Sequence, residues 1–168
     1  MKNTVIRYGV YGLLTAAILF LLALTLGKSL NYSAQEIVGY TTMVASLSFV
    51  FFGIKHYRDK ENNGIVSFGK ALKIGVLISL FAGIGFGIID YIYTTVINPD
   101  FATEYLDKTL ETMKSTLSAE EFEIEKTKLT QQMADYGGSG FMAFIMFSSV
   151  VIIGFIISLI SSLILQRK

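Results

Sequence analysis

The amino-acid sequence predicts an all-α integral membrane protein, a four-helix bundle with an extracytoplasmic helical hairpin between the third and fourth spans. Composition is the first observation, because 52% of the 168 residues are hydrophobic and only 16% are charged, whereas about a quarter of a soluble domain is charged. The second is that four apolar stretches approach the roughly 20 residues with which a helix crosses a hydrocarbon core about 30 Å thick. The third is charge separation, since most acidic residues lie in one stretch and most basic residues flank the apolar ones.

The four predicted spans belong to a single membrane domain, residues 1–168, and cover about residues 8–26, 37–54, 74–97 and 141–165. Lys2 and Arg7 precede the first span as they would precede a secretory signal. Its apolar run is longer than that of a signal, however, and no A-x-A-like cleavage site follows. We therefore expect the first span to stay attached. The second span contains several hydroxyl side chains, which can bond to helix carbonyls or to a neighbouring helix.

Lysine and arginine residues in the short loops predict the orientation of the chain. Nine basic residues fall on one side of the four spans, which we assign to the cytoplasm together with both termini: Lys2, Arg7, Lys55, Arg58, Lys60, Lys70, Lys73, Arg167 and Lys168. The opposite side carries Lys28 in its short loop. It also carries the segment 98–139, in which four lysines accompany nine carboxylates: Asp100, Glu104, Asp107, Glu111, Glu120, Glu121, Glu123, Glu125 and Asp135. This acidic segment is predicted to lie outside the cell.

Segment 98–139 is predicted to form two amphipathic helices. Asn98 can cap a first helix that starts at Pro99, and the apolar residues of this helix recur on one face: Leu106, Leu110, Met113 and Leu117. Ser118 and Glu121 have the capping-box spacing of a second helix, which ends at Gly137 and Gly138 and has its own apolar face: Phe122, Leu129, Met133 and Tyr136. We expect either a helical hairpin or two helices that prolong the third and fourth spans.

Small residues recur every four positions along the third span and predict a face against which another helix packs closely. They are Gly75, Ser79, Gly83 and Gly87, with Ala82 and Gly85 beside them. The fourth span has a complementary series in Gly154, Ser158 and Ser162, and the first has Gly12 and Ala16. Packing inside one bundle, a homodimer seam and a sliding surface in a transporter all fit this pattern. Ile78, off the small-residue face, is expected to face lipid.

Three patterns resemble ligand sites but lack essential groups. Gly64 to Ala71 comes within one residue of the phosphate-loop pattern G-x-x-x-x-G-K-[ST], but Ala71 has no hydroxyl for magnesium, no strand precedes it, and a membrane span follows. His56 has no second histidine or cysteine with which to form a metal site, so we expect it to be solvated or to face headgroups, with a pH-sensing role left open. The external carboxylates lack the loop geometry of a calcium site. The sequence therefore predicts no catalytic residue, no metal and no cofactor.

Asp90 is the candidate intramembrane polar site, because it lies inside the third span. An ionised carboxylate near the middle of a membrane helix costs roughly 2.5–3.5 kcal/mol on insertion scales, and less towards the ends. Such a residue is expected to have a partner or a use. Its candidate partners are Lys28 and the hydroxyls of Tyr40, Tyr93 and Thr94. A structural polar contact and a proton or cation site are both open interpretations.

Three motifs resemble those of a known family. They are Ser-Phe-Gly-Lys-Ala-Leu-Lys-Ile-Gly at residues 67–75, Tyr-Ile-Tyr at 91–93 and Asn-Pro-Asp-Phe at 98–101. With the four-span layout they make nearly the whole chain similar to the bacterial membrane proteins classed as domain of unknown function 4199, found mainly in Bacteroidota. The resemblance implies a multi-pass protein of the bacterial cytoplasmic (inner) membrane. It implies no activity, cofactor or catalytic residue.

A non-enzymatic structural, assembly or envelope-partner role is the function we expect, since no nucleophile and base, metal cluster or phosphate loop is found in the sequence. The alternative is a small transporter or channel that uses Asp90 as a proton or cation site. An intramembrane enzyme is expected least, because His56 and Asp90 are predicted at opposite sides of the bilayer. Expected partners are the lipid bilayer, a second copy through the small-residue helix faces, and an envelope protein at the external acidic segment. Nucleic acid is not expected.

Overall fold

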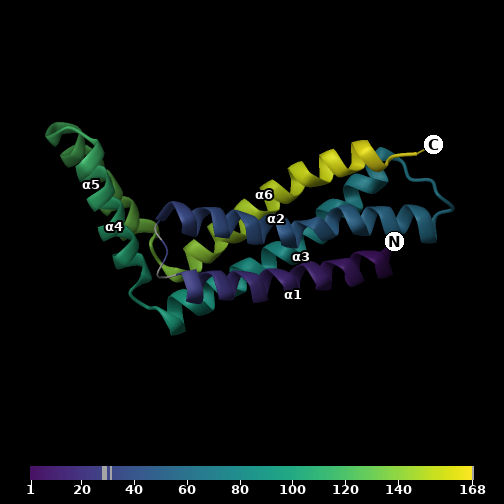
Figure 1. Cartoon of the computed structure of the whole chain (residues 1–168), viewed down its shortest axis with the longest axis horizontal. Helices are drawn as coiled ribbons and strands as arrows, with labels where there is room; N and C mark the ends of the chain where they lie inside the picture. Colours follow the sequence, from purple (N-terminus) through teal and green to yellow (C-terminus); the bar gives the residue numbers. More distant parts are fainter. Residues whose placement is uncertain (28–29, 31, 168) are drawn as a thin grey trace. The chain divides into compact units, whose positions relative to one another are not determined.

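The computed structural model describes residues 1–27, 30 and 32–167, and the all-helical fold class is confirmed (Figure 1). The described helices are α1 (Lys2–Leu26), α2 (Tyr32–His56), α3 (Phe68–Ile92), α4 (Phe101–Thr116), α5 (Ala119–Tyr136) and α6 (Ser139–Leu165). Two π-helical segments, η2 (Tyr57–Glu61) and η3 (Tyr93–Ile97), prolong α2 and α3. Within the described residues, four helical stretches are long and apolar enough to cross a membrane: Lys2–Leu26, Ala34–Glu61, Phe68–Ile97 and Ser139–Leu165. These helices extend beyond the apolar stretches in the sequence because their polar ends also adopt helical structure.

The chain divides into two compact units. The first unit comprises residues 1–89 and 145–168, and the second comprises residues 90–144. In the first unit, α1, α2 and the larger parts of α3 and α6 lie alongside one another as rods (Figure 1). The second unit contains the end of α3, η3, α4, α5 and the start of α6.

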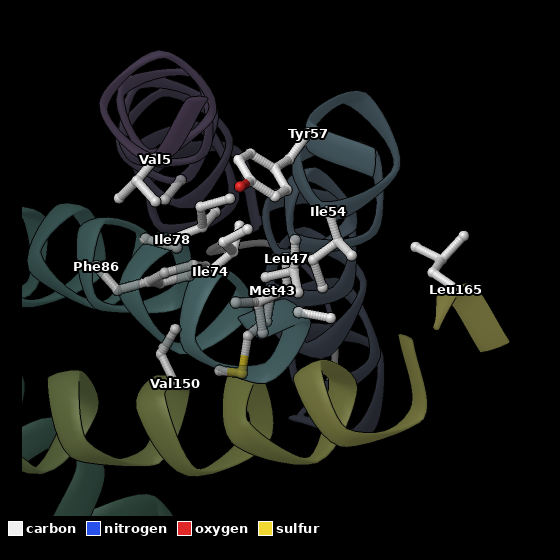
Figure 2. Close-up of a cluster of buried hydrophobic side chains, with 14 of the residues drawn as sticks. Val5, Met43, Leu47, Ile54, Tyr57, Ile74, Ile78, Phe86, Val150 and Leu165 are labelled. Atoms are coloured by element: carbon white, nitrogen blue, oxygen red, sulfur yellow. The ribbon is translucent and has the colours of Figure 1, made fainter. Parts of the chain in front are cut away.

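The core of the first unit lies between these four helices (Figure 2). Leu47 and Ile54 of α2, Ile74 and Phe86 of α3, and Val150 of α6 are completely buried. The ring of Phe86 lies 4.8 Å from that of Phe20 on α1, measured between centroids. Side chains from all four helices therefore close the interior.

The expectation that Ile78 faces lipid is wrong. Only 1% of its surface is exposed, and its Cδ1 occupies the space where a side chain on Gly53 of α2 would begin. The small-residue face is therefore not the sole buried face of α3, since helices pack against it from more than one direction.

The loop between η2 and α3 turns sharply and is tied to the end of α6. Asn63 and Gly64 have φ angles of 51° and 81°, in the left-handed region that asparagine and glycine tolerate best. Val66 and Arg167 exchange two backbone hydrogen bonds of 3.1 and 2.8 Å. Arg58 donates from Nη1 to the Leu165 carbonyl at 3.3 Å, which satisfies one of the carbonyls left open at a helix C-terminus.

The second unit contains the predicted pair of amphipathic helices, and its capping box is confirmed. Glu121 N–H donates to the Ser118 hydroxyl at 3.4 Å while the Ser118 N–H donates to the Glu121 carboxylate at 3.1 Å. Helix α5 ends where predicted, with Gly137 as its C-cap. The apolar faces of α4 and α5 are half-buried, except that Tyr136 is 56% exposed.

The predicted start of α4 is wrong. Its N-cap is Asp100, and the helix begins at Phe101 rather than at Pro99. Asn98 instead donates its backbone N–H to Tyr93 O at 2.7 Å, closing η3, and its side-chain amide to Glu104 at 2.9 Å. The third span therefore continues as a π-helix to Ile97, and this continuation moves the next helix start along the chain.

Candidate functional site

Asp90 is buried near the end of α3, with 6% of its surface exposed. In the part of the chain that the structure describes, its Oδ2 atom has no hydrogen-bond partner. More than nine-tenths of buried polar groups in proteins have such a partner, and an unpaired one in an apolar setting is costly. The carboxylate of Asp90 is therefore an exception that requires a physical reason.

The π-helical segment η3 begins three residues after Asp90, and hydroxyl side chains near it bond to backbone carbonyls. The Thr94 hydroxyl donates to the Asp90 carbonyl at 2.9 Å, and the Thr95 hydroxyl donates to the Tyr91 carbonyl at 2.6 Å. The Ser139 hydroxyl donates to the Thr94 carbonyl at 3.3 Å. The two threonine bonds join a hydroxyl to the carbonyl four residues earlier, as Thr41 also does in α2. Single π-helical turns inside helices occur frequently at functional sites.

The candidate partners of Asp90 have different fates. Lys28 lies outside the described residues. Tyr40 is 55% exposed, and the Thr94 hydroxyl is directed to the backbone of Asp90 rather than to its carboxylate. Tyr93 is 3% exposed, and its ring lies 5.7 Å from that of Phe101. The sequence indicated the buried carboxylate of Asp90. It did not predict η3, because the extra residue in each π-helical turn produces no recognisable pattern of side chains.

The small-residue face of α3 lies against α6 at three of its four positions. A Cβ atom built on Gly75 would lie 2.6 Å from Ser158 Oγ, and one on Gly83 would lie 2.9 Å from Val151 Cγ2. A Cβ on Gly154 would overlap the side chain of Ser79. A larger residue at these contacts would force the facing side chains to shift. Gly87, the fourth position, is half-buried.

Two further glycines allow other helices to approach closely. Gly85 brings α3 close to α1, and Gly53 brings α2 close to α1. A Cβ on Gly85 would lie 2.7 Å from the Leu13 carbonyl of α1. One on Gly53 of α2 would lie 3.2 Å from Tyr8 Cβ of α1. The Ser79 and Ser158 hydroxyls donate to carbonyls of their own helices, Val76 at 2.9 Å and Gly154 at 2.6 Å. Because both hydroxyls bond within their own helices, close packing rather than hydrogen bonding brings α3 and α6 together at Ser79 and Ser158. A homodimer seam at this face stays a prediction, and it would require α6 to leave it.

The loop that resembles a phosphate-binding motif uses its amides internally. The N–H groups of Gly64, Ile65 and Val66 donate to the carbonyls of Arg58, Asn62 and Arg167 at 2.8, 3.0 and 3.1 Å. A phosphate loop needs successive amides directed at the ligand. This geometry does not fit a nucleotide site.

His56 lies beside α1 at the end of α2. Its ring is 5.4 Å from that of Tyr8. Within the described residues, no three histidine or acidic side chains gather closely enough to hold a metal ion. His56 is therefore placed among aromatic and basic neighbours rather than in a ligand cluster.

The family comparison agrees with the motifs and the helix layout. A family model described as Protein of unknown function (DUF4199) matches residues 7–167. The chain belongs to this family. No curated protein and no solved structure matches it. This DUF4199 protein is therefore a helical protein with four stretches suited to a membrane, in a family whose description names no activity.

Proposed function

We propose that this DUF4199 protein crosses the cytoplasmic membrane of a bacterium four times, with both termini inside and α4 and α5 outside, and has a non-enzymatic structural or assembly role in the envelope. The observation that carries the proposal is that neither α4 nor α5 buries any residue completely, although each has an apolar face. A helix whose apolar face is left half-open presents that face to something else.

Charge indicates the kind of partner that α4 and α5 would bind. Segment 98–139 has nine carboxylates and four lysines. Two copies of this acidic surface would repel each other, as would an anionic bilayer. An envelope protein with basic and apolar side chains complements it. Close packing of α3 against its neighbours supports the same role, because it makes the first unit rigid.

Site-specific photo-crosslinking in native membranes tests this proposal. The photoreactive residue replaces Leu110 on the apolar face of α4 or, as a matched control, Glu111 on its exposed face. We expect one intermolecular adduct from position 110 and none from position 111. Reversing the flanking charges with Asp107→Lys and Glu111→Lys should remove that adduct, because a basic partner would be repelled. Equal adducts from both positions, or an adduct that survives the reversal, would contradict the proposal.

A small transporter or channel is the second candidate function, and the unpaired Oδ2 of the buried Asp90 favours it. Intramembrane carboxylates commonly mark proton or cation pathways. The substitution Asp90→Asn keeps the shape and removes the charge. The matched control is Asp100→Asn, at an exposed N-cap.

Hydrogen exchange near Tyr91 in the reconstituted protein distinguishes the two roles. Intrinsic exchange is base-catalysed and accelerates with pH at every amide, so the quantity compared is the protection factor, which corrects for this. A proton or cation site should make the protection factor change between about pH 5 and pH 8, where an ordinary carboxylate does not titrate, or on addition of Na⁺. Asp90→Asn should abolish the change and Asp100→Asn should keep it. No change in the parent protein under either condition would remove the support for a transporter. Unaltered exchange and equal or higher stability in Asp90→Asn would indicate a structural residue.

A further inference from the structure

Four exposed basic side chains lie at the end of α1 and α2 that carries the N-terminus. We refer to these side chains, of which Lys60 belongs to η2, as the α1–α2 basic patch: Lys2, Arg7, Lys55 and Lys60. None of them forms a salt bridge within the described residues. These cations have no salt-bridge partner there, although Glu61 attracts Arg7 and Asp59 attracts Lys55 at longer range.

The two nearby carboxylates already have other partners. Asp59 accepts hydrogen bonds from Arg58 at 2.6 and 3.2 Å. Glu61 accepts from the Thr4 hydroxyl at 2.5 Å and from the Met1 amino group at 2.7 Å. Each carboxylate is hydrogen-bonded to a cation outside the patch, so the four cations of the patch exceed the negative charge near them and can attract an external anion.

Aromatic contacts hold the α1 and α2 halves of the patch side by side. Tyr8 lies 5.4 Å from His56 and Tyr11 lies 5.9 Å from Phe49, measured between ring centroids. The Arg7 guanidinium lies next to the Tyr11 side chain, one turn along α1. Lys55 is the sequence neighbour of His56. The seam between the two helices therefore places cations from both on one end of the first unit.

Exposed apolar side chains adjoin the same cations. On α1 they are Ile6, Val10 and Tyr11, which are 45%, 38% and 44% exposed, and on α2 Phe52 is 52% exposed. Phe52 precedes Lys55 by three residues, so the two lie on one helix face. Apolar side chains that end in cations match a phospholipid, whose acyl chains lie beside a charged headgroup.

We infer that the α1–α2 basic patch binds the phosphate of an anionic phospholipid, whose acyl chains lie against the exposed apolar side chains of α1 and α2. The inference rests on the proposed function in one respect, namely that these helices cross a bilayer. It does not depend on which end faces the cytoplasm. Each basic side chain near a bilayer surface strengthens binding of anionic lipid by about 1 kcal/mol, or about five-fold.

Tryptophan quenching by brominated lipid measures this binding at one chosen place, because the chain contains no tryptophan. The reporter Phe52→Trp replaces one exposed aromatic residue with another beside Lys55. The reporter protein is reconstituted into vesicles of phosphatidylcholine and phosphatidylglycerol, and two preparations are compared in which only one of the two lipids is brominated. We expect brominated phosphatidylglycerol to quench more strongly, with a several-fold higher relative binding constant. Raising the NaCl concentration to about 1 M should remove the preference, since salt screens charge beyond about 3 Å.

Matched variants locate the effect. Adding Arg7→Gln and Lys55→Gln to the reporter should lower the relative binding constant several-fold, since two of the four cations are removed. Adding Lys108→Gln and Lys114→Gln, which remove the same charge from α4, should leave it unchanged. A second reporter, Phe144→Trp, carries an equally exposed residue in the second unit and should show no preference for either lipid.

Each outcome is decisive. Equal quenching by the two lipids at the Phe52→Trp reporter would overturn the lipid site and leave membrane insertion intact. A preference that Arg7→Gln and Lys55→Gln leave unchanged would overturn it as well. Absence of quenching by either lipid at both reporters would refute membrane insertion, and with it the proposed function.

Discussion

Gly75→Ala should destabilise the protein although alanine is the better helix former. The added Cβ would lie 2.6 Å from Ser158 Oγ, 2.8 Å from Ser158 Cβ and 3.0 Å from Val50 Cγ1. Ser158 cannot move freely, because its hydroxyl donates to Gly154 O at 2.6 Å. Overpacking of this kind costs about 1–3 kcal/mol, and removal of a helical glycine returns about 0.5–1 kcal/mol. The expected net loss is on the order of 1 kcal/mol.

Gly39→Ala isolates the overpacking, because Gly39 is also inside a helix and a Cβ there meets nothing within 4 Å among the described residues. This variant should be as stable as the parent or more stable by about 0.5–1 kcal/mol. The free energy of unfolding is measured for both in mixed micelles by titration with dodecyl sulfate, followed by far-UV circular dichroism. The two variants should differ by about 1–3 kcal/mol. Equal stability would refute the close approach of α3 and α6 at Gly75.

Other predictions concern α3 and the external pair. Gly83→Leu should unfold at a lower dodecyl sulfate fraction than the control variant Ile84→Leu, which changes an exposed neighbouring residue. The reason is that a leucine at position 83 would overlap Phe147 and Val151. Equal unfolding midpoints for the two variants would contradict this packing. Ser118→Ala should weaken amide protection in the first turn of α5 by about 1 kcal/mol, and undiminished protection would show that the cap is unimportant. Hydrogen bonds from the Ser118 hydroxyl and amide hold the pKa of Glu121 below its ordinary value of 4.5. The resulting stabilisation of α5 is present above pH 4.5 and is lost as the pH falls through the lowered pKa. The protection factor of the Phe122 amide, which corrects for intrinsic exchange, should show this loss in the parent protein and not in Glu121→Gln.

Local signals in the sequence predicted local structure well. The Ser118–Glu121 box and the Gly137 stop depend on residues within one or two turns, so their spacing is sufficient to locate α5. The four apolar stretches similarly give four long helices, because hydropathy depends on composition alone. Asp90 was recognised as buried for the same reason, since its neighbours along α3 are apolar.

Features that depend on several helices at once were not predicted. Ile78 was assigned to lipid because the small residues of α3 define one face, whereas Gly53 of α2 accepts Ile78 on another. The start of α4 was misplaced because the backbone N–H of Asn98 closes η3. Asn98 therefore belongs to the end of the preceding helix, whereas the prediction treated it as the N-cap of the next one. The unpaired Oδ2 of Asp90 could not be read from the sequence, because its surroundings depend on the fold.

Cysteine accessibility tests the transmembrane arrangement most directly, because the chain has no native cysteine. Ser67→Cys precedes α3 and Ser115→Cys lies near the end of α4, and both exchanges are nearly isosteric at exposed positions. A membrane-impermeant maleimide is added to intact spheroplasts, and total labelling is measured after lysis. We predict that Ser115→Cys reacts in intact spheroplasts and that Ser67→Cys reacts only after lysis. Labelling of Ser67→Cys alone would invert the orientation, and equal labelling of both in intact spheroplasts would contradict the four-span arrangement.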